Sequence, residues 1–229
     1  MKTRNTKLIA LVLALGFLMT NCGTVKDANS KQKGVAIGAA AGAILGGVLG
    51  NNLGKGGNSE LGAVLGAVIG GAAGGVIGNK MDKQAAEIEN ALPGAEVERV
   101  GEGIRVVLGE NAINFDFGKS TLTKQAKLNL DKVIPALNTE LNTNLLILGY
   151  TDSKGSEEFN LKLSKERAAA VVNYLKTHNV APSRIKMEGR GEAAPIATND
   201  TEAGRELNRR VEFVITANEQ MIKDAQSGK

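Results

Sequence analysis

The chain has 229 residues, of which 28 are basic and 24 acidic, a length that allows one or two domains. Three of the basic residues lie at the N-terminus, before an apolar run at 8–19. Without residues 1–21 the balance is 25 basic against 24 acidic residues, so the rest of the chain is almost neutral. A neutral chain without a basic patch is not expected to bind nucleic acid.

The N-terminus has the layout of an exported protein. A basic start followed by an apolar run too short to cross a bilayer predicts a secretory signal at 1–21. The single cysteine, Cys22, follows directly and cannot form an internal disulfide. The stretch Leu-Met-Thr-Asn-Cys-Gly around Cys22 resembles a bacterial lipobox, although Asn21 replaces the usual small residue. The resemblance implies acyl chains on Cys22; the alternative is a free thiol in a loop.

Glycine recurs at every fourth position through two apolar segments, 34–50 and 61–78, which follow a polar tether at 22–33. Flexible glycine linkers carry serine rather than valine and isoleucine. Glycine at this spacing instead forms a flat stripe that lets a second helix approach closely in a membrane. We therefore expect a glycine-zipper helical hairpin at 34–78. The pattern leaves three alternatives open for this hairpin: it is embedded in a membrane, it is associated with a membrane, or it is packed into a homo-oligomer.

The second half has the periodicity of a mixed α/β domain. Residues 79–93 are expected to form a helical linker that ends at Pro93-Gly94, a boundary signal. The domain at 94–216 should begin with a hairpin and continue in the order βαβαββ, which predicts an α+β fold with a mixed sheet. Its expected elements are strands at 96–100, 104–108 and 113–117, a helix at 123–139, a strand at 145–150, a helix that ends near 179, and strands at 185–188 and 211–216. Residues 217–229 are expected to be a flexible tail.

The most informative residues follow the expected central strand at 145–150. Asp152 lies at its carboxyl end, where ligands bind in open α/β sheets. Ser164 is expected to cap the next helix, which would place Arg167 in the first turn. One interpretation is a structural salt bridge between Asp152 and Arg167. The other is a site where Asp152 binds an amine and Arg167 a carboxylate, the two groups of a zwitterionic amino-acid head.

Five motifs in this region resemble the OmpA-like domain, a family that includes peptidoglycan-associated lipoproteins. They are Asn-Phe-Asp-Phe-Gly-Lys-Ser at 114–120, Gly-Tyr-Thr-Asp at 149–152, Asn-Leu-Lys-Leu-Ser-Lys-Glu-Arg-Ala at 160–168, Gly-Arg-Gly-Glu at 189–192 and Asn-Arg-Arg-Val-Glu at 208–212. The resemblance implies a peptidoglycan ligand, the diaminopimelate residue, with Asp152 on its ammonium and Arg167 on its carboxylate. Asn160 and Arg210 match accessory polar contacts.

The resemblance also implies a cellular role, that of an outer-membrane lipoprotein anchored through Cys22 whose periplasmic domain tethers the envelope to the cell wall. No cofactor or metal is expected. The alternative is a glycine-zipper oligomer that perturbs membranes or forms a pore. Catalysis is not expected, because the one histidine, His178, lies near a helix end and forms no metal-binding cluster or catalytic triad.

Overall fold

The computed structural model describes residues 72–115 and 118–228. The predicted signal at 1–21, the tether with Cys22 and the glycine-rich segment up to residue 71 lie outside the described residues. The expectations for their structure therefore stay predictions.

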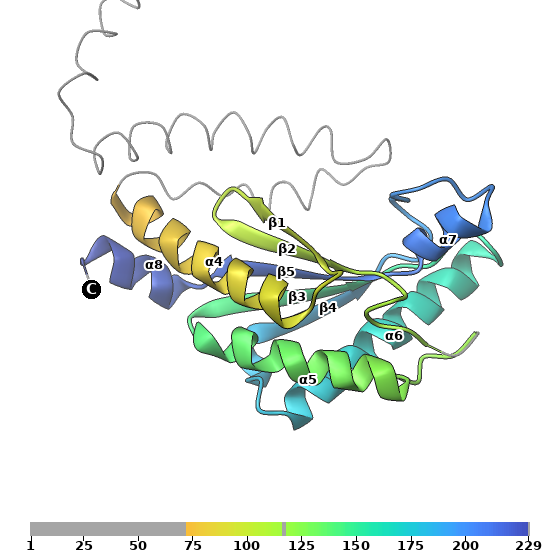
Figure 1. Cartoon of the computed structure of the whole chain (residues 1–229), viewed down its shortest axis with the longest axis horizontal. Coiled ribbons are helices and arrows are strands. Elements are labelled where there is room, and N and C mark those ends of the chain that lie inside the picture. The colour runs from red at the N-terminus through yellow and green to blue at the C-terminus, as the bar shows by residue number, and fades with distance from the viewer. Residues whose placement is uncertain (1–71, 116–117, 229) are drawn as a thin grey trace, which may run out of the picture.

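A five-stranded mixed sheet forms the centre of the domain, in the order β1-β2-β5-β3-β4 (Figure 1). The strands are β1 (Glu96–Val100), β2 (Gly103–Leu108), β3 (Thr143–Gly149), β4 (Ile185–Gly189) and β5 (Val211–Ala217). β3 and β4 are parallel, and the other neighbouring pairs are antiparallel. The carboxyl ends of β2, β3 and β4 therefore meet the start of β5 at one edge. The mixed sheet confirms the predicted α+β fold.

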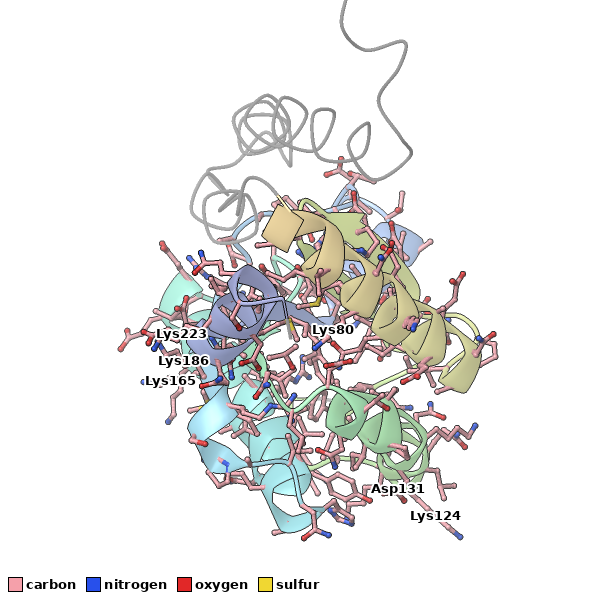
Figure 2. The ribbon with its side chains drawn as sticks, turned by 90° about the vertical axis from the view of Figure 1, so that its left-hand side faces the viewer. Lys80, Lys124, Asp131, Lys165, Lys186 and Lys223 are labelled. Carbon is pink, nitrogen blue, oxygen red and sulfur yellow. The ribbon has the colours of Figure 1, made fainter. Side chains whose placement is uncertain are left out.

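Helices cover one face of this sheet (Figure 1). They are α4 (Ala72–Ala91), α5 (Lys124–Thr139) and α6 (Glu157–Thr177), with the short 3₁₀ helix η1 (Pro182–Arg184), α7 (Glu202–Asn208) and α8 (Glu219–Gln226) at the ends of strands. The start of α5 agrees with the predicted 123–139, because the Thr123 side chain accepts a hydrogen bond from the Ala126 amide. Strand β4 is an edge strand, and its Lys186, labelled in Figure 2, is exposed. Charge at a sheet edge discourages pairing with other chains.

The expected linker at 79–93 is part of the domain core. Helix α4 runs without a break from the glycine-rich segment through this region, and Ile77, Met81 and Ile88 are fully buried. Gln84 adds a buried hydrogen bond from its Nε2 to the Ala136 carbonyl at 3.0 Å. The boundary predicted at residue 78 therefore lies within one continuous helix. Among the residues that the structure describes, no helix is both long and apolar enough to cross a membrane.

The expectation of a flexible tail at 217–229 is wrong for the described part of that segment. Ala217 still belongs to β5, and Asn218 caps α8 by accepting a hydrogen bond from the Met221 amide. Met221 and Ala225, four residues apart on one helix face, are buried in the core. Three apolar residues, Met221, Ile222 and Ala225, in a short polar segment gave too weak a periodicity to predict this helix.

Two further expectations differ from the structure. The strand expected at 113–117 is reduced to one bridge between Phe115 and Leu122; residues 116–117 lie outside the described part. Helix α6 begins two turns before the expected cap at Ser164, because Ser156 accepts a hydrogen bond from the Phe159 amide. Two glutamates in the following turn favour that start through the helix dipole. Arg167 therefore lies in the middle of α6.

Two glycines at the ends of the parallel strands set the position of α6. Gly149 and Gly189 are paired in register at the ends of β3 and β4. A Cβ atom on Gly149 would lie 2.2 Å from the Ser164 carbonyl oxygen, and one on Gly189 would lie 2.5 Å from the Lys165 amide nitrogen. The backbone of α6 is thus in direct contact with the edge of the sheet where Asp152 follows β3.

We predict that Gly149→Ala destabilises the domain. The added methyl group would clash with backbone that cannot rotate away, and such overpacking costs about 1–3 kcal/mol. Thermal unfolding followed by circular dichroism should show a melting temperature several degrees lower than that of the wild type. Gly109→Ala is the matched control, since a Cβ there meets nothing within 4 Å. Equal melting temperatures for the two variants would contradict the prediction.

Candidate functional site

A cavity of about 430 Å³ opens at the edge where the carboxyl ends of β2 and β3 meet α6 and α7. Its charged side chains come from segments that are far apart in the sequence. The lining residues include Glu110, Phe115, Asp152, Arg167, Glu202 and Arg209. The position agrees with the expectation that ligands bind outside the carboxyl ends of strands.

Asp152 is held from two sides. It is 8% exposed, and its Oδ1 accepts a hydrogen bond from the Lys154 amide at 2.9 Å. Its Oδ2 accepts one from Nη1 of Arg209 at 2.8 Å. A carboxylate has about four acceptor positions, so these two bonds fix its orientation and leave capacity for a further donor.

Arg167 enters the cavity from the middle of α6. It is 7% exposed, its Nε donates to the Lys119 carbonyl at 3.1 Å, and its guanidinium lies 5.0 Å from the centre of the Phe115 ring. Burial lowers the pKa of Arg167, attraction by Glu110 opposes that shift, and repulsion by Arg209 adds to it. A buried guanidinium held by a carbonyl and an aromatic ring is a favourable place for an anion.

Asp152 and Arg167 therefore line one cavity while each takes a different protein partner. Asp152 has its ion pair with Arg209, and Arg167 has its hydrogen bond with Lys119. Among the described residues the two side chains thus have separate partners, and the structure shows no direct salt bridge between them.

The two accessory residues behave differently from each other. Asn160 lines the cavity, is 1% exposed, and donates from Nδ2 to Oε2 of Glu192 at 2.6 Å. Arg210 is 2% exposed and lies below the cavity, where its guanidinium is 3.7 Å from the centre of the Tyr150 ring. Its Nε donates to Glu212 at 2.7 Å. The structure brings Asn160 to the site, but it gives Arg210 an internal role.

Sequence reasoning missed Arg209 and Glu110. Arg209 adjoins Arg210 in the Asn-Arg-Arg motif, yet it faces the cavity and contacts three carboxylates, those of Glu110, Asp152 and Glu202. Burial opposes the charge of Arg209, but its hydrogen bonds with Asp152 and Glu110 outweigh this effect and raise its pKa. No local pattern indicated Glu110, because this residue and Arg209 are 99 positions apart in the chain.

The OmpA family model matches residues 114–209 of the chain. This part of the chain is therefore similar to the OmpA family domain. A second family model, the YMGG-like Gly-zipper, matches residues 1–82 and confirms the glycine zipper as a sequence feature. It extends into α4, which the structure places against the OmpA family domain.

Relatives support both assignments. The chain is 36% identical over 137 residues to the "Probable lipoprotein YiaD" of Escherichia coli (strain K12), covering 59% of this chain and 63% of that protein. It is 45% identical over 101 residues to outer membrane protein A of Bordetella avium, covering 44% of this chain and 52% of that protein. The chain thus spans between half and two thirds of the length of these relatives.

A solved structure gives a third comparison. The cell wall anchor of the T6SS from Pseudomonas aeruginosa superposes with a TM-score of 0.52 at 25% identity, covering 60% of this chain and 97% of that one. By name, these similar proteins are a lipoprotein, an outer membrane protein and a wall anchor rather than enzymes, as was expected for this chain.

A buried ionic network supports the cavity of the OmpA family domain from below. Glu212, on β5, is 1% exposed and accepts hydrogen bonds from Arg105 at 2.9 and 2.7 Å and from Arg210 at 2.7 Å. Burial alone would raise the pKa of Glu212, but the hydrogen bonds from Arg105 and the charge of Arg210 lower it. Because Arg210 directly follows Arg209, this network fixes the backbone that carries Arg209.

We predict that Glu212→Gln destabilises the domain by about 3–5 kcal/mol at neutral pH, because it leaves two buried guanidinium groups without their shared anion. The lowered pKa means that the carboxylate contributes stability above its unfolded-state pKa and loses that contribution as pH falls. The difference in unfolding free energy between the wild type and Glu212→Gln should therefore narrow below a pH of about 4.3. Urea titrations across pH would measure it, and a constant difference would contradict the prediction.

Proposed function

We propose that this chain is an outer-membrane lipoprotein that binds peptidoglycan without covalent attachment and tethers the envelope to the cell wall. Its ligand is the diaminopimelate residue of the stem peptide. The free end of diaminopimelate carries an ammonium and a carboxylate on one carbon, and a site for it needs an anion and a cation at short range. The wall-anchor and lipoprotein names of the similar proteins support this assignment.

One observation carries the proposal. Asp152 and Arg167 line the same cavity, are both more than nine tenths buried, and are held by different partners. We assign the ammonium to Asp152 and the carboxylate to Arg167, which offers the planar two-pronged donor that suits a carboxylate. Asn160 supplies a polar contact beside them. Arg210 acts through Glu212 and the backbone of Arg209.

A lipid anchor on Cys22 would compensate for a modest affinity of the peptidoglycan site. A cavity that is open to water and holds one amino-acid head group is expected to bind with modest affinity. An acylated Cys22 would keep the domain next to a polymer with a repeating ligand, so the effective ligand concentration would be high. We propose that the periplasmic domain and the lipid-bearing end hold the wall and the membrane together in this way.

We predict that Asp152→Ala and Arg167→Ala each abolish binding of the full-length chain to purified peptidoglycan sacculi. Each variant removes a charge-assisted hydrogen bond to the ligand that contributes about 1.5–3 kcal/mol to binding. Because the affinity of the site is modest, this loss is enough to abolish detectable binding. The measurement is co-sedimentation with sacculi that contain diaminopimelate, and high salt should weaken wild-type binding because the contacts are between charges.

Asp131→Ala and Arg99→Ala are matched controls for these variants. They remove the same kinds of charge at positions outside the cavity; Asp131 lies on α5, labelled in Figure 2, and Arg99 pairs with Asp82. Both controls should sediment with the sacculi as the wild type does. Normal co-sedimentation of Asp152→Ala and Arg167→Ala would show that the residue assignment is wrong.

We also predict that Cys22→Ser removes the lipid anchor. Metabolic labelling with an alkyne fatty acid should mark the wild type and not the variant, and only the wild type should fractionate with membranes. Each buried methylene of an acyl chain contributes about 0.8 kcal/mol of membrane binding, so the loss should be large. Ser30→Ala, in the same tether, is the control. Labelling of Cys22→Ser would contradict the assignment.

A further inference from the structure

Arg209 lies where a ligand's ammonium group would be expected. Its Nη1 donates to Oδ2 of Asp152 at 2.8 Å, the carboxylate that the proposed function assigns to that group. Nε and Nη2 of the same guanidinium lie 2.9 and 2.8 Å from Oε2 of Glu110. One cation of the protein therefore already neutralises Asp152.

Glu110 completes the arrangement on the other side. Glu110 lines the cavity together with Arg167. The negative charge of Glu110 attracts the Arg167 guanidinium, whereas the positive charge of Arg209 repels it. Arg167 thus shares the cavity with a carboxylate of the protein that attracts it, and Asp152 is bonded to a cation of the protein. Glu110 and Arg209 together carry the two charges of a zwitterion.

We propose that the Glu110–Arg209 ion pair is an internal stand-in for the zwitterionic ligand, and that the ligand binds by displacing Arg209 from Asp152. The inference rests on the proposed function, because it concerns the same site. Asp152 and Arg167 are nearly buried, and an unpaired buried charge is costly. The stand-in keeps both charges compensated while no ligand is bound.

Arg209 would still have an ion pair with Glu202 after it leaves Asp152. Its Nη2 lies 3.1 Å from Oε1 of Glu202, an exposed residue of α7. Hydrogen bonds from Arg205 and Arg209 lower the pKa of Glu202 to about 2, so this carboxylate stays ionised throughout the physiological range. Side-chain exposures of 23% for Arg209 and 34% for Glu110 leave space for the rearrangement.

The displacement has two consequences for binding. Only molecules with Arg209 away from Asp152 are competent, so the apparent affinity is lower than the intrinsic one. A ligand that carries both an amine and a carboxylate can compensate both buried charges, whereas a ligand with one of these groups compensates only one of them.

The test is calorimetric titration of the full-length chain with a muropeptide that ends in diaminopimelate. Arg209→Gln removes the competitor of the ammonium and should bind about fivefold more tightly, the equivalent of one weak ion pair. Glu202→Gln removes the second partner of Arg209 and should bind more weakly than the wild type. Arg99→Gln makes the same charge change as Arg209→Gln outside the cavity and should leave the affinity unchanged.

Opposite shifts in the two site variants support the proposal. Weaker binding by folded Arg209→Gln would overturn it and make Arg209 a direct ligand contact, whereas Asp152→Ala and Arg167→Ala would still abolish binding. If Arg209→Gln fails to fold, unchanged or tighter binding by Glu202→Gln would overturn the proposal on its own. An absence of binding by every protein, the wild type included, would contradict the proposed function itself.

Discussion

The contact between the backbone of α6 and the ends of β3 and β4 determines the geometry of the site. Gly149 and Gly189 carry no Cβ, and this allows the helix to lie directly on the strand ends. Asp152 follows one of these strands and Arg167 projects from the helix, so their separation is fixed by backbone packing. The backbone positions of this proposed recognition pair therefore do not depend on side-chain conformation.

The charges of the site are organised in two levels. Below the cavity, Glu212 is enclosed by Arg105 and Arg210 and does not reach the ligand position. At the cavity, Arg209 connects Glu110, Asp152 and Glu202 in a setting that is more open to water. The lower network holds the backbone at the start of β5, and the upper network is the one that we propose to exchange partners on ligand binding. Adjacent arginines thus have different functions because alternate residues of the chain face opposite sides.

Much of the fold could be predicted from the sequence where a signal is local. The α5 helix was readable from its capping threonine and apolar face, and the β1–β2 hairpin from two short strands around glycines. The expected cap at Ser164 was wrong because Ser156, with two glutamates after it, is the stronger helix start. The α8 helix was missed because its stability comes from packing with α4 rather than from its own sequence.

Asp152 and Arg167 could be predicted as cavity residues from the sequence, whereas Arg209 and Glu110 could not. Asp152 and Arg167 lie in one continuous motif region, so their spacing along the chain indicated a common site. Arg209 and Glu110 come together only when β5 and β2 are placed side by side in the sheet. Their pairing is a property of the topology, and neither residue type nor local pattern could show which of two neighbouring arginines enters the cavity.

Helix α4 has a mechanical consequence. Every residue before Ala72 is connected to the site through this helix, whose apolar face is buried along most of its length. Under the proposed anchoring, a force on these preceding residues would reach the domain through α4. The buried side chains of this helix would have to leave the core before the force could act on the cavity.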